Sequence, residues 1–329
     1  MTKLAIIGGG SWGTALAMVL APRFELVTLW VYEADLAERM ARSRENDVFL
    51  PGSHLPDSVQ IATELPIALE GADIVLGVMP SHHARGIYTA MLPDLNASMI
   101  LVSATKGLEQ ASLLRMSEVI GQVVLTPHVA VLSGPTFARE VAAGNPTAVV
   151  VASSSPEVAR CVQEAFSGPT FRLYTNADPV GVEVGAALKN VIAIGAGICE
   201  GLGLGHNPTA ALITRGLAEI TRLAIAMGGQ AKTLAGLAGL GDLVLTCSGD
   251  LSRNRYVGKE LGAGKPLAEI LGSMRMVAEG VETCASAVAL GQKLRVDLPI
   301  IQQMHAVLSA GKSPKEAVRD LMDRSLKGE

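Results

Sequence analysis

The chain has 329 residues, of which 49% are hydrophobic and 18% are charged, and its formal net charge is -4. This length accommodates two domains, and the composition supports a large buried core rather than disorder. The acidic balance argues against a nucleic-acid-binding protein, which needs a basic face, but allows a small anionic substrate held by local cations. No integral membrane segment is expected, because no stretch reaches the roughly 18 uninterrupted apolar residues of a spanning helix.

The first half of the chain alternates short apolar runs with helical patterns. An apolar run at 4–7 ends in three glycines, and a helix is predicted at 14–20. Further buried strands are predicted at 26–31, 73–78, 99–102, 129–132, 147–152 and 170–174. Helices are predicted between them at 34–44, 112–120 and 156–166. Strands that alternate with helices predict βαβ units and a mostly parallel sheet.

The pattern changes near residue 180, beyond which only helical periodicity remains. Helices are predicted at 182–199, 208–227, 255–261, 266–271, 282–290 and 300–308. An α/β half followed by an all-α half predicts two domains, with the ligand site in a cleft between them.

A glycine-rich loop follows the first predicted strand and opens the first helix. It reads Gly8-x-Gly10-x-x-Gly13. The first glycine permits a tight turn, the second lets the backbone approach a pyrophosphate, and the third lets the helix pack on the strand. The pyrophosphate would lie at the helix N-terminus. We therefore predict a Rossmann-type dinucleotide-binding domain at 1–180 and a helical substrate-binding domain at 181–329.

The end of the second predicted strand bears on the choice of cofactor. Tyr32 and Glu33 lie there, and Glu33 is 20 residues past Gly13, where a carboxylate can accept a hydrogen bond from a ribose 2′-OH. Alternatively, Glu33 only begins the next helix, where acids favour the positive end of the dipole. We expect NAD(P)H as cofactor, with NADH favoured over NADPH. Three arginines of the following helix could still reach a 2′-phosphate: Arg39, Arg42 and Arg44.

Two lysines are candidates for work on a carbonyl or an anion. Lys106 follows a predicted strand, where it could meet an oxygen atom of a ligand, or could be a solvated surface lysine. Lys189 lies within an apolar helix, where lysine is rarely buried without a partner. A desolvated lysine near other cations has a lowered pKa and can exchange a proton near neutrality. The alternative is a lysine that extends its charged end to solvent from the helix edge.

A predicted helix start offers a phosphate site. Ser252, Arg253 and Asn254 lie there, with Ser252 or Asp250 as the N-cap. Guanidinium and backbone N–H groups at a helix N-terminus suit a phosphate dianion, although an ordinary capped helix has the same pattern.

Metal and disulfide chemistry are not expected. His82 and His83 are adjacent, which suits neither helical nor strand chelation, and the four cysteines form no C-x-x-C pair. We therefore predict free thiols and a cytoplasmic protein.

Taken in order, these motifs resemble those of the NAD(P)-dependent glycerol-3-phosphate dehydrogenase family, bacterial type, over nearly the whole chain. The matching stretches are 8–15, 45–46, 50–52, 55–56, 105–107, 133–135, 188–190, 239–243, 251–255 and 278–283.

The resemblance implies an oxidoreductase that interconverts dihydroxyacetone phosphate and sn-glycerol 3-phosphate by hydride transfer with NAD(P)H. It also implies supply of glycerol 3-phosphate for phospholipid synthesis, and a homodimer. It places Lys189 as the proton-transfer residue, with Asp242 and Asn190 beside it. The implied contacts to the substrate come from Lys106, Gly134 and Thr136, and those to its phosphate from Ser252, Arg253 and Asn254. The implied contacts to the cofactor come from Ser11, Trp12, Lys106, Ala138, Arg253, Val277 and Glu279.

The chain departs from the family pattern at two positions. Bacterial members usually carry a basic residue near position 32, whereas Tyr32 and Glu33 look more like the NAD-specific eukaryotic members. Thr136 replaces the commoner serine but keeps the hydroxyl.

Two alternative functions remain. One is a 3-hydroxyacid dehydrogenase of similar layout, which would carry Lys-x-x-x-Asn, whereas here Asn190 follows Lys189 directly. The other is a nucleotide-sensing regulator without turnover. The presence of Lys106, Lys189, Asp242 and Arg253 together argues against a regulator.

Overall fold

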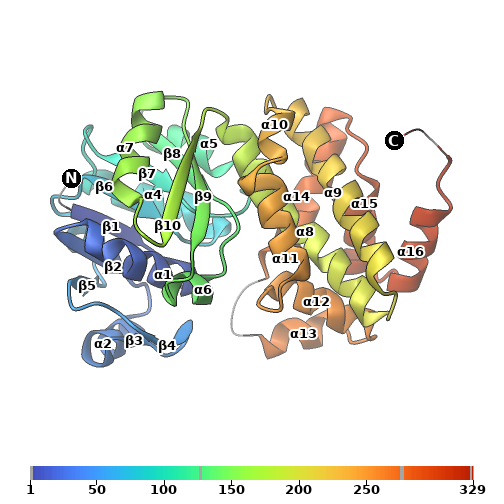
Figure 1. Ribbon diagram of the computed structural model, residues 1–329, viewed down its shortest axis with the longest axis horizontal. Coiled ribbons are helices and arrows are strands. Elements are labelled where there is room, and N and C mark those ends of the chain that lie inside the picture. Colours follow the sequence, from blue (N-terminus) through green and yellow to red (C-terminus); the bar gives the residue numbers. More distant parts are fainter. Residues whose placement is uncertain (1–2, 126–127, 275–277, 327, 329) are drawn as a thin grey trace. The chain divides into compact units, whose positions relative to one another are not determined.

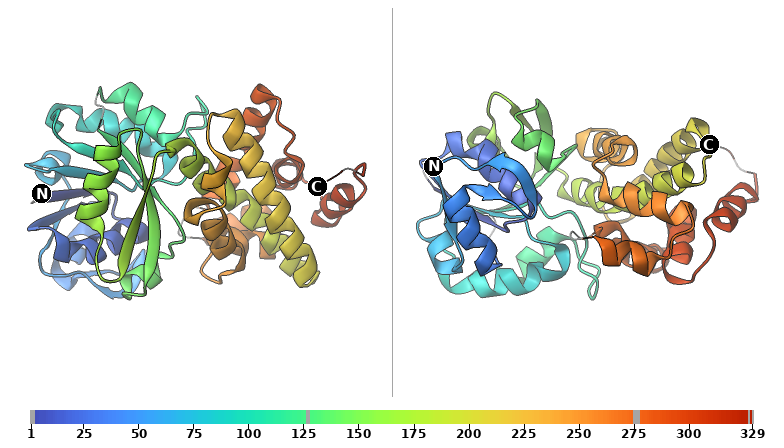
Figure 2. Two further views of the ribbon diagram at one scale, coloured as in Figure 1. Left: turned by 45° about the horizontal axis from the view of Figure 1, so that its top comes forward. Right: turned by 90° about the horizontal axis from the view of Figure 1, so that it is seen from below.

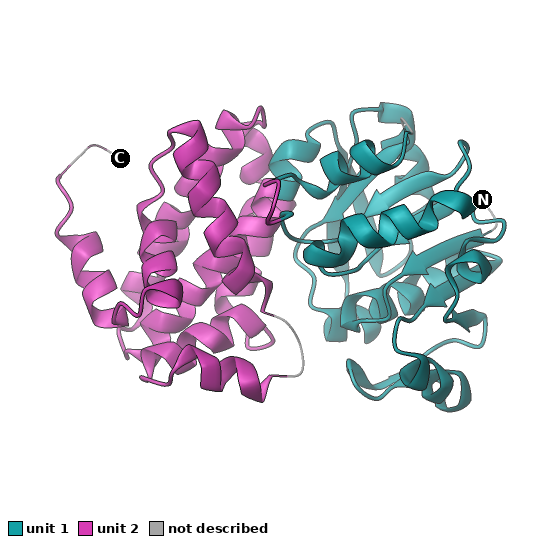
Figure 3. Cartoon of the chain, turned by 180° about the vertical axis from the view of Figure 1, so that it is seen from behind, with its two compact units in different colours: residues 1–109, 114–183 teal, residues 110–113, 184–329 magenta. Residues whose placement is uncertain are grey.

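The computed structural model describes residues 3–125, 128–274, 278–326 and 328. The described residues form two compact units, which Figure 3 shows in different colours. Unit 1 comprises residues up to 109 and residues 114–183, and unit 2 comprises residues 110–113 and the chain from 184 onward. Unit 1 holds every strand described, and unit 2 is helical, which confirms the predicted fold class. The two compact units divide between residues 183 and 184. The functional boundary between a dinucleotide-binding domain and a substrate-binding domain at 180/181 stays a prediction.

Unit 1 is built on one eight-stranded sheet. Its strand order is β10-β9-β8-β7-β6-β1-β2-β5, and all neighbours are parallel except β8 and β9. The strands are β1 (Lys3–Ile7), β2 (Leu26–Trp30), β5 (Val59–Ala62), β6 (Ile74–Gly77), β7 (Ile100–Ser103), β8 (Val129–Ser133), β9 (Thr147–Ala152) and β10 (Phe171–Asn176). The prediction of a mostly parallel sheet is therefore confirmed.

Helices cover both faces of this sheet (Figures 1 and 2). Alternate residues of β1 face opposite sides, so Leu4 and Ile6 join one hydrophobic core while Ala5 and Ile7 join the other. The first core includes residues of α1 (Ser11–Leu20), α2 (Ala34–Ser43), α6 (Ala138–Ala142) and α7 (Pro156–Phe166). The second includes residues of α3 (Leu65–Leu69), α4 (Ser81–Met91) and α5 (Met116–Val123). Two short 3₁₀ turns complete the unit, η1 (Ala21–Arg23) and η2 (Leu92–Asp94).

Some elements of unit 1 were not predicted. A small antiparallel hairpin, β3 (Glu45–Asn46) with β4 (Leu50–His54), lies between α2 and β5 in the chain. Asn46 and Leu50 are its only buried residues, so no apolar alternation revealed it. Helix α1 begins at Ser11 rather than at residue 14, so the last residues of the glycine loop form the first helical turn.

Unit 2 consists of helices around the long helix α8. Its elements are α8 (Pro179–Gly201) from residue 184 onward, α9 (His206–Ala226), α10 (Ala231–Leu234), the π-helical turn η3 (Leu237–Gly241), α11 (Asp242–Ser248), α12 (Arg253–Gly262), α13 (Leu267–Ser273), α14 (Glu279–Leu294), α15 (Pro299–Ser309) and α16 (Pro314–Met322). Among the described helices, α8 alone has the length and apolar character of a membrane span. Its apolar window is entirely buried inside the protein, as in a core helix.

Candidate active site

The glycine loop follows β1, the strand at which the order of strands in the sheet reverses. The chain passes from β1 to β2 on one side and later returns to β6 on the other, and ligands of parallel sheets bind at such switch points. Gly8 has φ +128°, and a Cβ there would lie 2.9 Å from the carbonyl of Val78. A Cβ on Gly13 would lie 1.9 Å from the carbonyl oxygen of Gly8. Both glycines therefore serve close backbone packing.

Gly10 differs from its neighbours, because a Cβ there would meet no atom within 4 Å. It is the N-cap of α1, whose first N–H groups have no partner within the helix. The loop therefore has the space and the donors that a dinucleotide pyrophosphate requires. Ser11 starts the helix, half-buried. The ring of Trp12 packs against the core. Its indole N–H is buried and has no partner among the described residues, so the group that Trp12 can offer to a ligand is its backbone N–H.

The end of β2 is open to solvent. Tyr32 is 77% exposed and meets Trp30 edge-on, with ring centroids 6.0 Å apart. Glu33 is exposed at the N-cap of α2, where its side chain makes no capping hydrogen bond.

The three arginines after Glu33 all have partners within unit 1. Arg39 contacts two carboxylates, those of Asp35 and Asp47. Arg42 pairs with Glu38. Arg44 donates to the carbonyl oxygens of Pro56 and Val59.

Lys106 joins two loops at the carboxyl ends of β7 and β8. Its Nζ donates to the carbonyl oxygen of Gly134 at 3.0 Å and to Oγ1 of Thr136 at 2.9 Å, and the Thr136 hydroxyl donates to the same carbonyl. Gly134 has φ +147°, and a Cβ there would lie 3.0 Å from Cα of Val149. Ala138 begins α6, which packs against α1. The structure thus brings together the three residues that the resemblance assigned to the substrate.

Lys189 is buried in unit 2 with a carboxylate beside it. Its side chain is 6% exposed, and Nζ lies 2.5 Å from Oδ1 of the fully buried Asp242. It also donates to Oγ1 of Thr246 at 2.9 Å. The ammonium therefore does not extend to solvent from the helix edge. Its charged partner is the carboxylate of Asp242, which the resemblance had placed beside it, and not a second cation.

Local backbone geometry positions Asp242. The π-helical turn η3 directly precedes it, and such turns are frequent at functional sites. A Cβ on Gly239 would lie 2.1 Å from the carbonyl oxygen of Leu234, so only glycine fits there. Thr246 follows Asp242 by one helical turn on α11, and we had given it no role. No helix was predicted over residues 242–248, so the i, i+4 spacing of Asp242 and Thr246 did not reveal it.

Cys247 follows Thr246 but is not a candidate nucleophile. Burial raises the pKa of its thiol to about 12, although the charge of Lys189 opposes this shift. The thiol therefore stays protonated at neutral pH.

The start of α12 gathers the residues expected to hold phosphate. Oγ of Ser252 is the N-cap and accepts a hydrogen bond from the N–H of Arg255 at 3.2 Å. Oδ1 of Asn254 accepts from the N–H of Gly280 at 3.0 Å. The side-chain oxygens of Ser252 and Asn254 thus each accept a hydrogen bond from the backbone. Arg253 is exposed at the first helical position.

Asn190 and Glu279, two further predicted residues, lie at or against the start of α14. A Cβ on Gly280 would lie 2.7 Å from the carbonyl oxygen of Asn190, which is itself buried beside Lys189 in the chain. Glu279 is half-buried as the first residue of α14. Val277 lies outside the described residues.

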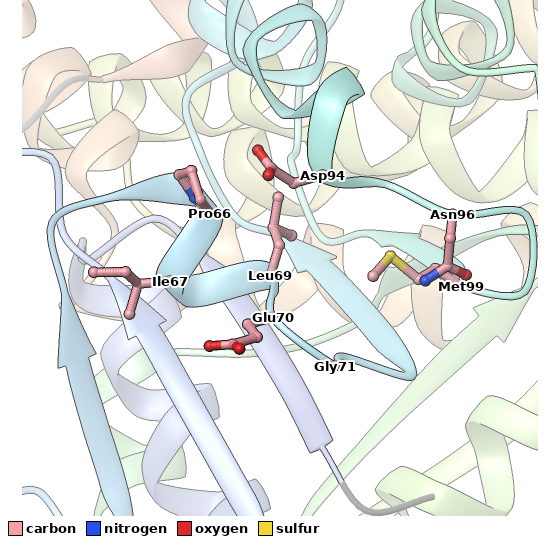
Figure 4. Close-up of a pocket in the computed structure, with 8 residues that line it drawn as sticks. All are labelled: Pro66, Ile67, Leu69, Glu70, Gly71, Asp94, Asn96 and Met99. Atoms are coloured by element: carbon pink, nitrogen blue, oxygen red, sulfur yellow. The ribbon is translucent and has the colours of Figure 1, made fainter.

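A hollow of about 380 Å³ lies elsewhere in unit 1 (Figure 4). Residues of α3 and of the segments before β6 and β7 line it, including Glu70, Asp94 and Met99. It thus lies toward the amino ends of these strands, whereas ligands of parallel sheets bind at the carboxyl ends. We do not assign it to the active site.

Comparison with known proteins finds one family over both units. Residues 3–159 match the family described as NAD-dependent glycerol-3-phosphate dehydrogenase N-terminus, and residues 178–319 match its C-terminus. The chain is 58% identical over 329 residues to a protein of Koribacter versatilis named glycerol-3-phosphate dehydrogenase (NAD(P)+), and 98% of each chain is covered. It is 56% identical to the protein of the same name from Citrifermentans bemidjiense, covering 99% of this chain and 98% of that one.

A solved structure matches the fold as well. The crystal structure of glycerol-3-phosphate dehydrogenase from Coxiella burnetii has a TM-score of 0.95 and 41% sequence identity, covering 98% of this chain and 99% of that one.

Proposed function

This chain belongs to the NAD-dependent glycerol-3-phosphate dehydrogenase family, and we propose that it interconverts dihydroxyacetone phosphate and sn-glycerol 3-phosphate with NAD(P)H. The observation that carries the reaction is the buried contact of Lys189 with Asp242 and Thr246. A proton donor held in one position by a carboxylate and a hydroxyl suits reduction of a carbonyl group. The 3-hydroxyacid dehydrogenase and the regulator without turnover are both disfavoured by the family assignment.

Lys189 is the general acid in this proposal. When bound, NAD(P)H supplies the hydride that reduces the carbonyl carbon. The ammonium of Lys189 donates a proton to the carbonyl oxygen, which becomes the hydroxyl of glycerol 3-phosphate. Asp242 and Thr246 orient Nζ during this transfer. Asn190, the next residue of α8, is buried as well. In the reverse direction, neutral Lys189 accepts the hydroxyl proton.

The substrate is bound by cations and helix-terminal donors. We assign Lys106, Gly134 and Thr136 to the carbon skeleton, because one hydrogen-bonded cluster holds them at the carboxyl ends of β7 and β8. We assign the phosphate to Arg253, with the hydroxyl of Ser252 and the amide N–H₂ of Asn254 as further donors at the start of α12.

We further propose that NADH is preferred over NADPH. Glu33 is exposed where a carboxylate can accept a hydrogen bond from the ribose 2′-OH, and it would repel a 2′-phosphate. The contacts of Arg39, Arg42 and Arg44 within unit 1 support this preference, because a 2′-phosphate would have to compete with existing partners.

Purified protein tests the reaction directly. NADH absorbance should fall on addition of dihydroxyacetone phosphate and should not fall on addition of a 3-oxo acid. Failure to oxidise NADH or NADPH with dihydroxyacetone phosphate would refute the proposal.

The cofactor preference has its own measurement. Wild-type protein should have the higher kcat/KM with NADH, and Glu33→Ala should shift the ratio of the two kcat/KM values toward NADPH. If the wild type favours NADPH, or if Glu33→Ala leaves the ratio unchanged, then Glu33 only starts a helix.

We also propose a cytoplasmic homodimer that supplies glycerol 3-phosphate for phospholipid synthesis. A location in a reducing compartment is supported by the four cysteines, none of which forms a disulfide. Cell fractionation, light scattering of the purified protein, and labelling of phospholipids in a deletion strain test the three parts separately.

A further inference from the structure

Asn46 is a buried amide that lies against the glycine loop from a distant part of the sequence. It belongs to the β3–β4 hairpin and is 0% exposed. Its Nδ2 donates to the carbonyl oxygen of Gly9 at 2.8 Å and to Oγ1 of Thr14 at 2.8 Å. Its Oδ1 accepts from the N–H of Phe49 at 2.9 Å. One side chain therefore connects the hairpin to the glycine loop.

The contact with Gly9 sets the direction of a peptide group. The carbonyl of Gly9 and the N–H of Gly10 belong to the same planar trans peptide, so they point in opposite directions. Because Asn46 holds the carbonyl on the buried side, the N–H faces the other side. Gly10 adjoins open space, whereas a Cβ on Gly9 would lie 2.8 Å from the side chain of Val31.

Such a peptide needs an external restraint. Between two glycines, no side chain limits the backbone dihedral angles. A flipped peptide would turn the Gly9 carbonyl oxygen toward an anionic ligand and remove one N–H donor. The hydroxyl of Thr14, 3.5 Å from the same carbonyl, adds to the restraint from within α1.

We propose that Asn46 is a positioning residue for the cofactor, holding the Gly9–Gly10 peptide so that the Gly10 N–H faces the dinucleotide pyrophosphate. This inference rests on the proposed function only in that a dinucleotide binds at the loop. It predicts that Asn46 acts on cofactor affinity and not on dihydroxyacetone phosphate.

Two substitutions separate the loop contact from the hairpin contact. Asn46→Ala removes both. Asn46→Asp keeps an oxygen that can accept from the N–H of Phe49, but a carboxylate cannot donate to Gly9. When protonated at lower pH, the aspartic acid regains one O–H donor. Relative to wild type at the same pH, the affinity of Asn46→Asp for the cofactor should therefore improve as the pH falls, and that of Asn46→Ala should not.

The primary measurement is calorimetric binding of NADH and of ADP-ribose, both of which carry the pyrophosphate. We expect both variants to bind each ligand about tenfold more weakly at neutral pH, the loss for one hydrogen bond of roughly 1.4 kcal/mol. The KM for dihydroxyacetone phosphate at saturating cofactor should change by less than about twofold, a free-energy difference no larger than that of one weak surface interaction. Ser153→Ala is the control, since it removes partly buried hydrogen bonds to the carbonyl of Val129 and from the N–H of Ser155 elsewhere in unit 1, and it should leave both quantities unchanged.

Three results would overturn the proposal. The first is wild-type affinity for NADH and ADP-ribose in both variants. The second is a parallel rise of the cofactor Kd and the substrate KM, as general loosening would give. The third applies if the Asn46 variants do not fold. In that case Thr14→Val, which replaces the hydroxyl with a methyl group, should still weaken NADH binding. Unchanged NADH binding in Thr14→Val would then refute the proposed restraint on the Gly9–Gly10 peptide. Because binding is measured without turnover, wild-type protein that binds NADH but does not reduce dihydroxyacetone phosphate refutes the proposed function alone.

Discussion

At the scale of single residues, the proposed proton transfer depends on a charge that the fold removes from water. A buried charge is costly unless it is paired and hydrogen-bonded, so Lys189 can persist within α8 only because Asp242 and Thr246 lie against it. The same contacts hold its Nζ in one place.

Replacing the proton donor should abolish most of the activity. Lys189→Met keeps the aliphatic volume but removes the ammonium, and kcat should fall by about two to four orders of magnitude. Thr246→Val removes one orienting hydrogen bond and should lower kcat by about tenfold. Steady-state kinetics at saturating substrate measures both, with the exposed Lys259→Met of α12 as the control. Nearly normal kcat in Lys189→Met would contradict the assignment.

Arg253 offers a second test at this scale. A planar guanidinium can bind a phosphate with two parallel hydrogen bonds, whereas an ammonium is a point charge. Arg253→Lys and Arg253→Ala should therefore both lower kcat/KM for dihydroxyacetone phosphate, the alanine variant more, while Arg319→Lys on α16 should not. Normal kcat/KM in both Arg253 variants would place the phosphate elsewhere.

At the scale of elements, unit 2 depends on how closely its helices approach α8. A Cβ on Gly197 of α8 would lie 1.9 Å from the carbonyl oxygen of Arg255, and a Cβ on Gly258 of α12 would lie 1.9 Å from that of Ile194. The two backbones are therefore in direct contact. This contact positions the start of α12, where Arg253 lies, relative to the helix that carries Lys189.

A single methyl group should disturb this contact. Gly258→Ala would force α8 and α12 apart and should lower the free energy of unfolding by about 3 kcal/mol, the upper end of overpacking costs. Gly272→Ala is the matched control, since it lies in α13 with no atom within 4 Å of an added Cβ. The control should raise stability by about 0.5 kcal/mol through helix propensity. Urea unfolding measures both, and equal stabilities would contradict the close contact.

At the scale of the whole molecule, each unit contains a buried carboxylate that makes stability depend on pH. Burial raises the pKa of Glu183 in unit 1, against the opposing charge of Arg115. Burial also raises the pKa of Glu219 in unit 2 from 4.5 to about 7, although the N–H groups of Ile300 and Ile301 favour the charged form. Between pH 4.5 and about pH 7, Glu219 of the folded chain holds a proton that the unfolded chain has released. Raising the pH therefore favours unfolding.

The pH dependence can be assigned to Glu219 by one substitution. Between these pH values the stability of the wild type relative to Glu219→Gln should fall by about 3 kcal/mol, because each pKa unit corresponds to roughly 1.4 kcal/mol. Chemical unfolding of both proteins at several pH values gives this difference. Parallel curves for the two proteins would show that Glu219 titrates normally in the fold.

The sequence by itself determined the fold class, the family and seven of the eight strands of the large sheet, because these follow from local patterns; elements such as β5, α3, α11 and α16 were not predicted. Apolar runs, helical periodicity and the Gly8–Gly13 spacing are all visible along the chain, and α7 begins and ends where its pattern predicts. The β3–β4 hairpin was not predicted, because its buried residues show no periodicity. Only the tertiary structure decided that Thr246 joins Lys189 and that Asn46 holds Gly9, since these contacts join residues 57 and 37 positions apart. Such pairings depend on how separate elements pack together, which no local pattern encodes.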